Sequence, residues 1–379
     1  MTLRSPEVEL LFCCSRADNA GVEIPENLDW AALVEAAEHH GLAPVLHCVV
    51  ERAPAGQVPQ DAARRLRDCY RDAARRNLVF TAKLLELLDA FAREGVAVVA
   101  VKGPVLAEML YADPVLRPFS DLDLLVRKQD VAAALRILTG AGYRLGAHLA
   151  RLSVRGLLRL EFEVLLQQGP MPPVDLQWEI GLGDYPFCYD PELLWSSLGR
   201  VRMAGREVAG LSLESLLLFL CVHGAKHLWS RLHWLGDLAR LAALQPDWEA
   251  ALRLAAQAGC ERPVLLGLLL AHQVAAAAVP EPILQRAGEV EAVRRLADQV
   301  VARLQRIPPE DPDGVELTEF NARLAEQRWK KMWHYAGMLR APTDEELKLV
   351  ALPEGLFFLY YPLRAVRLAV KYGARLVRG

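Results

Sequence analysis

The chain has 379 residues, of which 53% are apolar and 24% are charged. These values are typical of a folded protein and exclude an intrinsically disordered one. The formal net charge is -3 and no long block of like charge occurs, which disfavours a template-reading polymerase that binds nucleic acid by electrostatic attraction. The length predicts two or three structural units rather than one compact core.

Seven cysteines are scattered along the chain without a CxxC pair, which argues against a disulfide framework and a zinc site and favours a reducing cytoplasm. The stretch from Met1 to Cys14 has charges within its short apolar run and is not typical of a signal peptide. No segment has the roughly 18 to 20 consecutive apolar residues that a membrane span needs. We therefore expect a cytoplasmic protein that is soluble or at most peripheral.

The first ninety residues have helical spacing of apolar side chains. They recur every three or four positions in Trp30–His40, Asp61–Asn77 and Leu78–Arg93, and a proline-rich stretch at Ala53–Pro59 separates the first helix from the second. We therefore expect an N-terminal helical region over residues 1–94.

The period changes after Gly95. Val96–Val101 (VAVVAV) is typical of a buried strand, and the following Lys102-Gly103-Pro104 suits a helix start. Further strands are predicted at Asp121–Val126, Glu161–Leu166 and Val174–Ile180, with a helix at Asp130–Thr139. A Gly/Pro cluster between the last two strands suits a hairpin. We expect a catalytic core over residues 95–190 with a mixed sheet of about four strands.

Helical periodicity returns after Asp190 and predicts a helical domain over residues 191–306, packed on the core. Its helices are expected at Glu214–Ser230, Leu232–Leu244, Trp248–Ala258, Val264–Ala278 and Val290–Gln305, and one more at Leu317–Trp333. The proline- and acid-rich segment Ile307–Gly314 is the best linker candidate, so residues 307–379 form a linker and a C-terminal helical tail. The fold class is α+β, a small mixed sheet flanked by helical regions.

Two aspartates carry the strongest chemical signal. Asp121 and Asp123 lie two apart in a predicted strand and so project from the same face. Carboxylates this close repel each other unless a cation lies between them, and magnesium prefers such hard oxygen ligands. An isolated Asp-x-Asp pair is more often a solvated face, so the interpretation depends on its context.

That context is the strand Val96–Val101 running into Lys102-Gly103 and a helix, with Arg117 and Ser120 just before the pair. Asp175 supplies a third carboxylate, because the predicted hairpin brings its strand beside the first pair. Three carboxylates can share two magnesium ions about 3.5 to 4 Å apart, which bridge the phosphates of a nucleotide and activate the attacking oxygen. We expect Mg²⁺ as the cofactor, with Mn²⁺ as a substitute.

Phosphate contacts are expected just before the aspartates. Gly103 allows backbone amides to approach phosphate at a helix N-terminus, and Ser120 adjoins the acidic pair. Lys102 and Arg117 are candidates for stabilising the charge of the triphosphate. The alternative is a surface lysine for Lys102 and, equally weighted, a salt bridge to Asp113 or Asp121 for Arg117.

The run VKGPVLAEMLYADPVLRPFSDLDLLV, followed by VDLQW, resembles an uncharacterised bacterial nucleotidyltransferase family of the polymerase β-like superfamily. The resemblance covers about Gly95 to Ile180 and extends loosely through Leu241. It implies that Asp121, Asp123 and Asp175 are the metal ligands and that Gly103 is the glycine turn. The chain differs from the family pattern at Pro104 and Gln177.

This resemblance implies transfer of a nucleoside monophosphate from a nucleoside triphosphate, with ATP as the first candidate, to a hydroxyl-type acceptor on a small molecule, peptide or protein. No template nucleic acid is expected. The alternatives are a phosphotransferase on the same fold and a non-catalytic interaction protein with a degenerate core.

A second polar cluster follows in CVHGAKHLWSRLHWLGD, residues 221–237. His223 and His227 share a helix face, but no HExxH glutamate or thiolate accompanies them, which disfavours zinc. We predict that this helix packs against the active site and that Lys226 and His227 bind the nucleotide. Equally weighted is a structural role in which Asp237 pairs with Lys226 or Arg231.

The C-terminus combines an apolar run with a cationic stripe at helical spacing. The stripe comprises Arg364, Arg367, Lys371, Arg375 and Arg378. Such a helix could make peripheral contact with an anionic membrane. We favour a helix that packs on its own domain and exposes its basic face.

Overall fold

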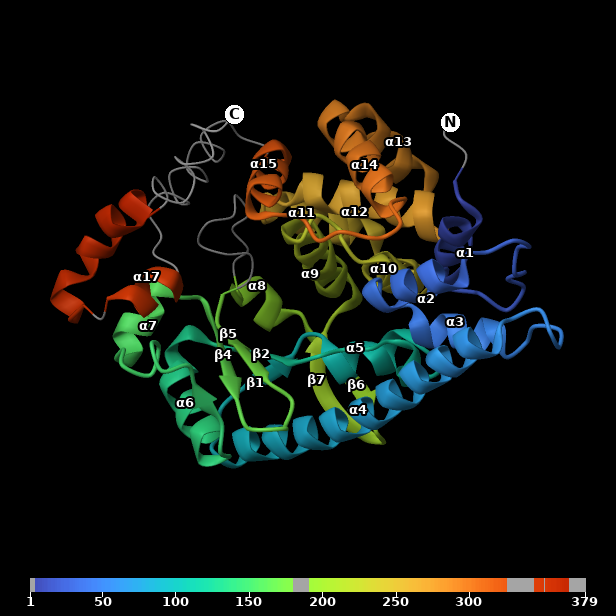
Figure 1. Cartoon of the computed structure of the whole chain (residues 1–379). Helices are drawn as coiled ribbons and strands as arrows, with labels where there is room; N and C mark the ends of the chain where they lie inside the picture. The colour runs from blue at the N-terminus through green and yellow to red at the C-terminus, as the bar shows by residue number, and fades with distance from the viewer. Residues whose placement is uncertain (1–3, 180–190, 326–343, 351, 368–379) are drawn as a thin grey trace.

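The computed structural model describes residues 4–179, 191–325, 344–350 and 352–367. Helices and strands alternate only in the middle of the chain (Figure 1). The strands are β1 Val98–Ala100, β2 Leu122–Val126, β3 Arg144–Leu145, β4 Glu163–Gln167, β5 Val174–Gln177, β6 Leu198–Met203 and β7 Arg206–Leu211. The central helices are α5 Gly103–Leu110, α6 Val131–Gly140, α7 Val154–Leu160 and α8 Pro191–Ser196.

Helices make up both ends of the described chain. Before the sheet lie α1 Pro6–Ser15, α2 Trp30–His39, α3 Ala43–Val50 and α4 Gln60–Arg93. After it lie α9 Leu213–Lys226, α10 Leu232–Ala243, α11 Trp248–Gln257, α12 Glu261–Ala275, α13 Glu281–Glu289, α14 Glu291–Leu304, α15 Gly314–Leu324 and α17 Asp344–Leu349. The α+β prediction is confirmed.

The main sheet has five strands in the order β1-β2-β5-β4-β3. Strands β2 and β5 are parallel, and the other pairs are antiparallel. The predicted hairpin of β4 and β5 is confirmed. The sequence prediction missed β3 at the sheet edge and the separate β6–β7 hairpin, whose strands pair from Leu198 opposite Leu211 to Met203 opposite Arg206.

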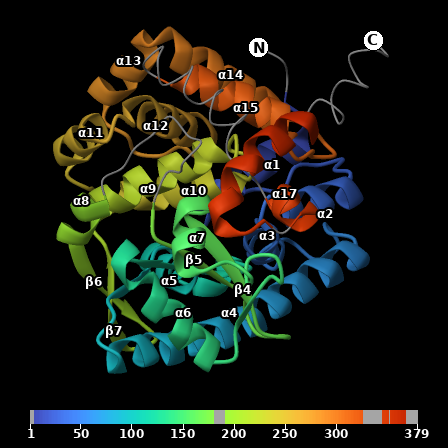
Figure 2. The same ribbon diagram turned by 90° about the vertical axis from the view of Figure 1, so that its left-hand side faces the viewer.

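Helix α4 joins two hydrophobic cores. Leu66 in its first half belongs to a core that includes helices α1–α3 and α9–α14, whereas Leu84 and Phe91 in its second half pack under the sheet with α6. The helix runs along the bottom of the molecule, and α13 and α14 lie at the top (Figures 1 and 2). The predicted break at Asn77 and Leu78 is wrong, because no glycine or proline interrupts the 34 residues.

The C-terminal segment packs back on the sheet core. Phe357 and Tyr360 are buried in that core. Arg364 and Arg367 both bind the fully buried Glu346, so the predicted solvated basic face is wrong for these two residues. Lys371, Arg375, Arg378 and the predicted helix beyond residue 325 lie outside the described residues.

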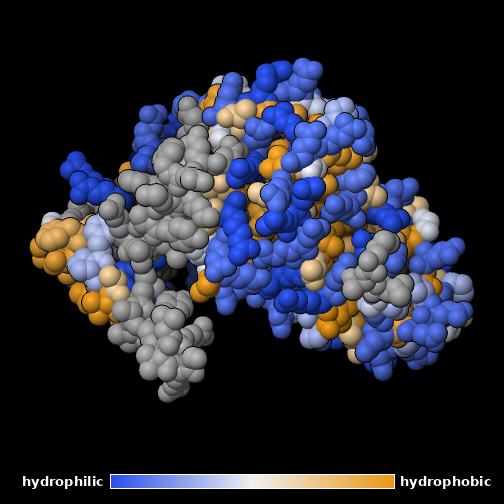
Figure 3. All heavy atoms as spheres, turned by 90° about the horizontal axis from the view of Figure 1, so that it is seen from above, coloured by the Kyte–Doolittle hydropathy of each residue, from blue (hydrophilic) through white to orange (hydrophobic). Residues whose placement is uncertain are grey.

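The surface seen from above is mostly hydrophilic, and apolar side chains gather at its left edge, where the segment 344–367 lies in Figure 1 (Figure 3). Phe358 and Val366 of this segment are 59% and 62% exposed. No helix in the described ranges combines the length and the apolar character needed to span a bilayer.

Candidate active site

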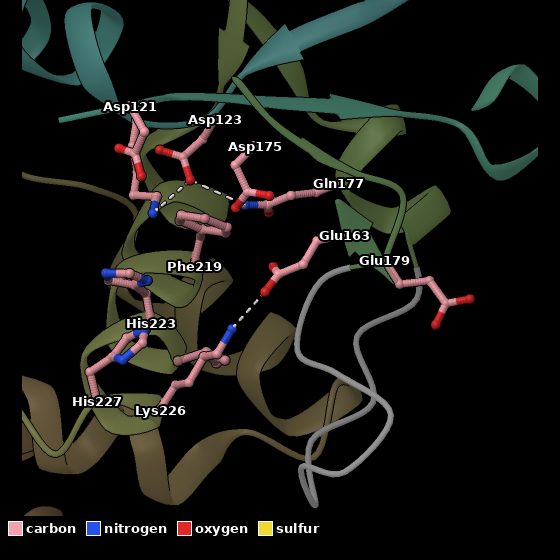
Figure 4. A pocket seen from close by; sticks show the side chains of 12 residues that line it. Asp121, Asp123, Glu163, Asp175, Gln177, Glu179, Phe219, His223, Lys226 and His227 are labelled. Carbon is pink, nitrogen blue, oxygen red and sulfur yellow. Dashed lines mark hydrogen bonds and ion pairs between the residues drawn. The ribbon is translucent and has the colours of Figure 1, made fainter. Parts of the chain in front are cut away.

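Asp123 and Asp175 are directly opposite each other in the parallel pair β2–β5. Since register partners in neighbouring strands point to the same face of a sheet, their carboxylates meet in front of the sheet. Asp121 lies immediately before β2 and joins them in the same cavity (Figure 4). The three aspartates that the sequence predicted as metal ligands therefore converge.

The cavity has a volume of about 260 Å³ and lies between the sheet and α9. The sheet side contributes acids, and α9 contributes aromatic and basic side chains (Figure 4). The lining residues are Lys102, Asp121, Asp123, Glu163, Asp175, Gln177, Glu179, Phe219, Val222, His223, Lys226 and His227. Five of these side chains are carboxylates, so the cavity is suited to cations or cation-bearing ligands.

Two N–H donors already hold the acidic group together. Lys102 Nζ lies 2.8 Å from Asp123 Oδ1. Gln177 Nε2 donates to the same oxygen at 3.1 Å and to Asp175 Oδ2 at 2.8 Å. Gln177, which differs from the family pattern, thus fixes two of the carboxylates side by side.

The acids repel each other in this buried place. Burial, followed by the charges of Glu163 and Asp123, raises the pKa of Asp175 to about 7. Burial and the charge of Asp123 also raise the pKa of Asp121. Burial alone would lower the pKa of Lys102, but the three aspartates, Asp123 above all, raise it, so the ammonium is charged.

A magnesium ion fits the chemistry of this donor set, because its oxygens are hard ligands and their negative charge exceeds the single charge of Lys102. Across the described ranges, no group of three or more His, Cys, Asp or Glu side chains is arranged so that it could hold a metal ion. Within the acidic group, one oxygen each of Asp123 and Asp175 already accepts hydrogen bonds from nitrogen. The types of donor atom therefore suit magnesium, but the side chains must move before they can coordinate an ion.

Of the predicted nucleotide contacts, Lys102, Lys226 and His227 line the cavity. Gly103 is buried and is not among the lining residues. Its φ is +60°, a conformation that glycine adopts without strain, and a side chain there would approach the Asp121 carbonyl oxygen at 3.4 Å. Ser120 is exposed and is not among the lining residues.

Arg117 does not line the cavity and binds another carboxylate instead. Its guanidinium binds both carboxylate oxygens of Asp237 at 2.9 to 3.0 Å, and neither residue lines the cavity. The salt-bridge alternative is therefore correct in kind but wrong in partner: Arg117 pairs with neither Asp113 nor Asp121, and Asp237 pairs with neither Lys226 nor Arg231.

Helix α9 carries the opposite wall. Phe219, His223 and His227 lie four residues apart and so on one helix face, and the ring centroids of the two histidines are 4.9 Å apart. Burial lowers the pKa of His223 strongly, and burial with the charge of Lys226 lowers the pKa of His227 to about 3, so both rings are neutral at pH 7. Lys226 Nζ lies 3.3 Å from Glu163 of β4.

Sequence reasoning missed Glu163 and Glu179 of the cavity wall. Glu179 was recognisable in retrospect, because residues 175, 177 and 179 alternate along one face of the strand predicted at Val174–Ile180. Glu163 was not, since its place depends on the register that sets it opposite Gln177.

The model of an uncharacterised nucleotidyltransferase family matches residues 26–276, which is more than half of the chain. No curated protein and no solved structure matches. The match includes the whole sheet and helices α9 to α12, and therefore every residue that lines the cavity.

Proposed function

The chain belongs to this uncharacterised nucleotidyltransferase family, and on that basis we propose that it transfers a nucleoside monophosphate from a nucleoside triphosphate to a hydroxyl-type acceptor. ATP is the first candidate donor, and the acceptor group would belong to a small molecule, peptide or protein. The observation that carries the proposal is the convergence of Asp121, Asp123 and Asp175 in one cavity, with Asp123 opposite Asp175.

The three aspartates would hold Mg²⁺, or Mn²⁺ in its place, and three carboxylates suffice for the two ions of a two-metal site. When bound, the metal neutralises phosphate charge and polarises the reacting oxygens. Asp175 would also accept the proton of the acceptor hydroxyl, because its carboxylate lies beside that of Asp123 in the same cavity. Gln177 keeps Asp175 beside Asp123 for this purpose.

The basic residues of the cavity would bind the triphosphate. Lys102 lies beside the aspartates, and Lys226 lies across the cavity on α9 (Figure 4). Cations on two sides would hold the phosphate chain between the acids and the helix, which is the positioning that phosphoryl chemistry mainly requires. His227, a neutral ring beside Lys226, would contact the base or sugar.

The non-catalytic alternative rested on the departures at Pro104 and Gln177. Gln177 now argues for an organised site, because its amide joins two of the three aspartates. Pro104 lies at the start of α5, where a missing N–H leaves no helical hydrogen bond unmade. We therefore place the enzyme ahead of the scaffold.

The test compares the purified protein with its Asp121→Ala/Asp123→Ala variant. Each is incubated with each nucleoside triphosphate, Mg²⁺ or Mn²⁺, and an extract of the source cells, and released pyrophosphate and labelled acceptor are measured. Losing residues that merely orient metal ligands costs about 10- to 100-fold, so losing two ligands should cost more than about 100-fold.

A matched control is the Asp61→Ala/Asp72→Ala variant, which removes two exposed acids of α4. It should retain native activity. Transfer of a phosphoryl group instead of a nucleotidyl group would identify a phosphotransferase. Absence of turnover by the native protein with every nucleotide and both metals would leave the non-catalytic alternative.

A further inference from the structure

Lys102 already supplies a cation to the acidic centre. Its Nζ lies 2.8 Å from Asp123 Oδ1, and its side chain is only 15% exposed. The centroid of the Phe219 ring lies 6.0 Å from the same Nζ. Besides Asp123, the charges of Asp121 and Asp175 also act on this ammonium. Lys102 is therefore held in the place where a metal ion would neutralise the aspartates.

Asp123 Oδ1 has no lone pair left for a metal. A carboxylate oxygen accepts about two hydrogen bonds, and this one accepts from Lys102 and from Gln177 Nε2. A metal ion that uses this oxygen must displace one of the two donors. Lys102 is the donor that leaves, because its charge repels the incoming cation, whereas Gln177 is neutral and is also bound to Asp175.

The phosphates of a bound nucleotide can take up the displaced ammonium. Lysine is a compact charge on a flexible stem and is a common ligand of phosphate groups. If the cavity takes a nucleoside triphosphate, as proposed above, the released Nζ remains within the cavity and close to that anion. The lysine then has an anionic partner both in the metal-free protein and in the protein that holds the metal and the nucleotide.

We propose that Lys102 couples metal binding to nucleotide binding: it holds Asp123 when no metal is present and moves to the triphosphate when a divalent cation takes its place. Lys102 thus competes with the metal and assists the nucleotide. This inference rests on the proposed function, because it requires a triphosphate in the cavity. It makes the two ligands bind cooperatively through one side chain.

The test measures binding rather than turnover. Electron paramagnetic resonance of free Mn²⁺ gives the metal affinity of the native protein and of Lys102→Met without nucleotide, and calorimetry with a non-transferable ATP analogue and Mn²⁺ gives the nucleotide affinity. Couplings of this kind are typically about 5- to 150-fold, so we expect Mn²⁺ to bind Lys102→Met about 10-fold more tightly and the analogue about 10-fold more weakly. Unchanged or weaker Mn²⁺ binding, or unchanged analogue binding, would overturn the proposal.

Two further variants keep the outcome specific. Lys128→Met removes an exposed lysine that pairs with Glu179 at the cavity wall and should leave both affinities unchanged. Lys102→Arg retains a positive charge beside Asp123. This variant should therefore keep the native Mn²⁺ affinity, and it can be measured even if Lys102→Met does not fold. If Lys102→Arg binds Mn²⁺ about 10-fold more tightly than the native protein, the positive charge at position 102 does not hinder metal binding and the proposal is wrong.

The failure of this inference is distinguishable from that of the proposed function. If neither the native protein nor any variant binds Mn²⁺, the metal site itself fails. If the native protein binds Mn²⁺ and the analogue but Lys102→Met binds both with the native affinities, the metal site stands and the coupling role is wrong.

Discussion

Two buried acid–base clusters lie where the sheet region meets the C-terminal helices, and they differ in charge balance. In the first, the carboxylate of Asp237 accepts hydrogen bonds from the Arg117 guanidinium and from the Tyr111 hydroxyl. The Asp237 side chain is fully buried. In the second, Asp121, Asp123 and Asp175 share the single ammonium of Lys102 and open to a cavity. A buried pair with balanced charge is typical of a structural salt bridge. An excess of negative charge at a cavity indicates a site for a cationic ligand.

The balanced cluster should matter most for stability. Asp237→Ala leaves Arg117 charged and buried without its partner, and breaking a buried pair in this way costs about 3 to 5 kcal/mol. Urea unfolding followed by circular dichroism measures the loss. A matched control is Asp89→Ala, which breaks the half-exposed pair with Arg206 and should cost far less, because water screens an exposed ion pair. Equal losses in the two variants would contradict the comparison.

The unbalanced cluster should instead respond to metal. A ligand that binds only the folded state stabilises it by about 2.7 kcal/mol at 100 times its Kd. Saturating Mg²⁺ should therefore raise the Tm of the native protein in differential scanning fluorimetry. The Asp121→Asn/Asp123→Asn variant should show no shift, whereas Asp237→Asn, if it folds, should keep it. A shift that survives in the double aspartate variant would place the metal elsewhere.

Much of the sheet was predictable because its signals are local. A β-branched run marked β1, short apolar runs around the aspartates marked β2 and β5, and the Gly/Pro cluster marked the β4–β5 turn. The β6–β7 hairpin also has a local signal, two residues of positive φ at Ala204 and Gly205, but alanine is unusual in such a turn and hid it.

The aspartate triad was predictable for the same reason, since two members are two residues apart and the third opens a recognisable strand. The Arg117–Asp237 pair was not, because its members are 120 residues apart and meet only through the packing of α10 against the core. The hydrogen bond from Gln177 to Asp123 was equally hidden, because it depends on the parallel register of β2 and β5.

Surplus charge should also destabilise the metal-free protein. Because the pKa of Asp175 is raised to about 7 in the folded state, its ionisation above pH 7 opposes folding, and the opposition fades as the pH falls toward the ordinary value near 4. Asp175→Asn should therefore be more stable than the native protein by about 1 to 2 kcal/mol at pH 8 without metal, with little difference at pH 4. Urea unfolding at both pH values measures this difference. A variant less stable at pH 8 would contradict the interpretation.

The smallest effect is expected at Lys226, which lies at the other end of the cavity. Its pair with Glu163 is partly exposed, so Lys226→Met should change the free energy of unfolding by no more than about 1 kcal/mol. If Lys226 binds the triphosphate, the same change should raise the KM for nucleotide by about 3- to 10-fold and leave kcat nearly unchanged, as expected for contacts made equally in the ground and transition states. Steady-state kinetics of pyrophosphate release measures both constants.

Glu163→Gln separates the two roles of Lys226, because it removes the same ion pair and leaves the ammonium in the cavity. If the lysine binds nucleotide, this variant should keep the native KM or lower it, since the cation is then released from its acidic partner toward the phosphates. If the pair serves only to hold α9 against β4, both variants should change the same constants by similar amounts, and Lys226 would then belong with Arg117 among the residues of structural salt bridges.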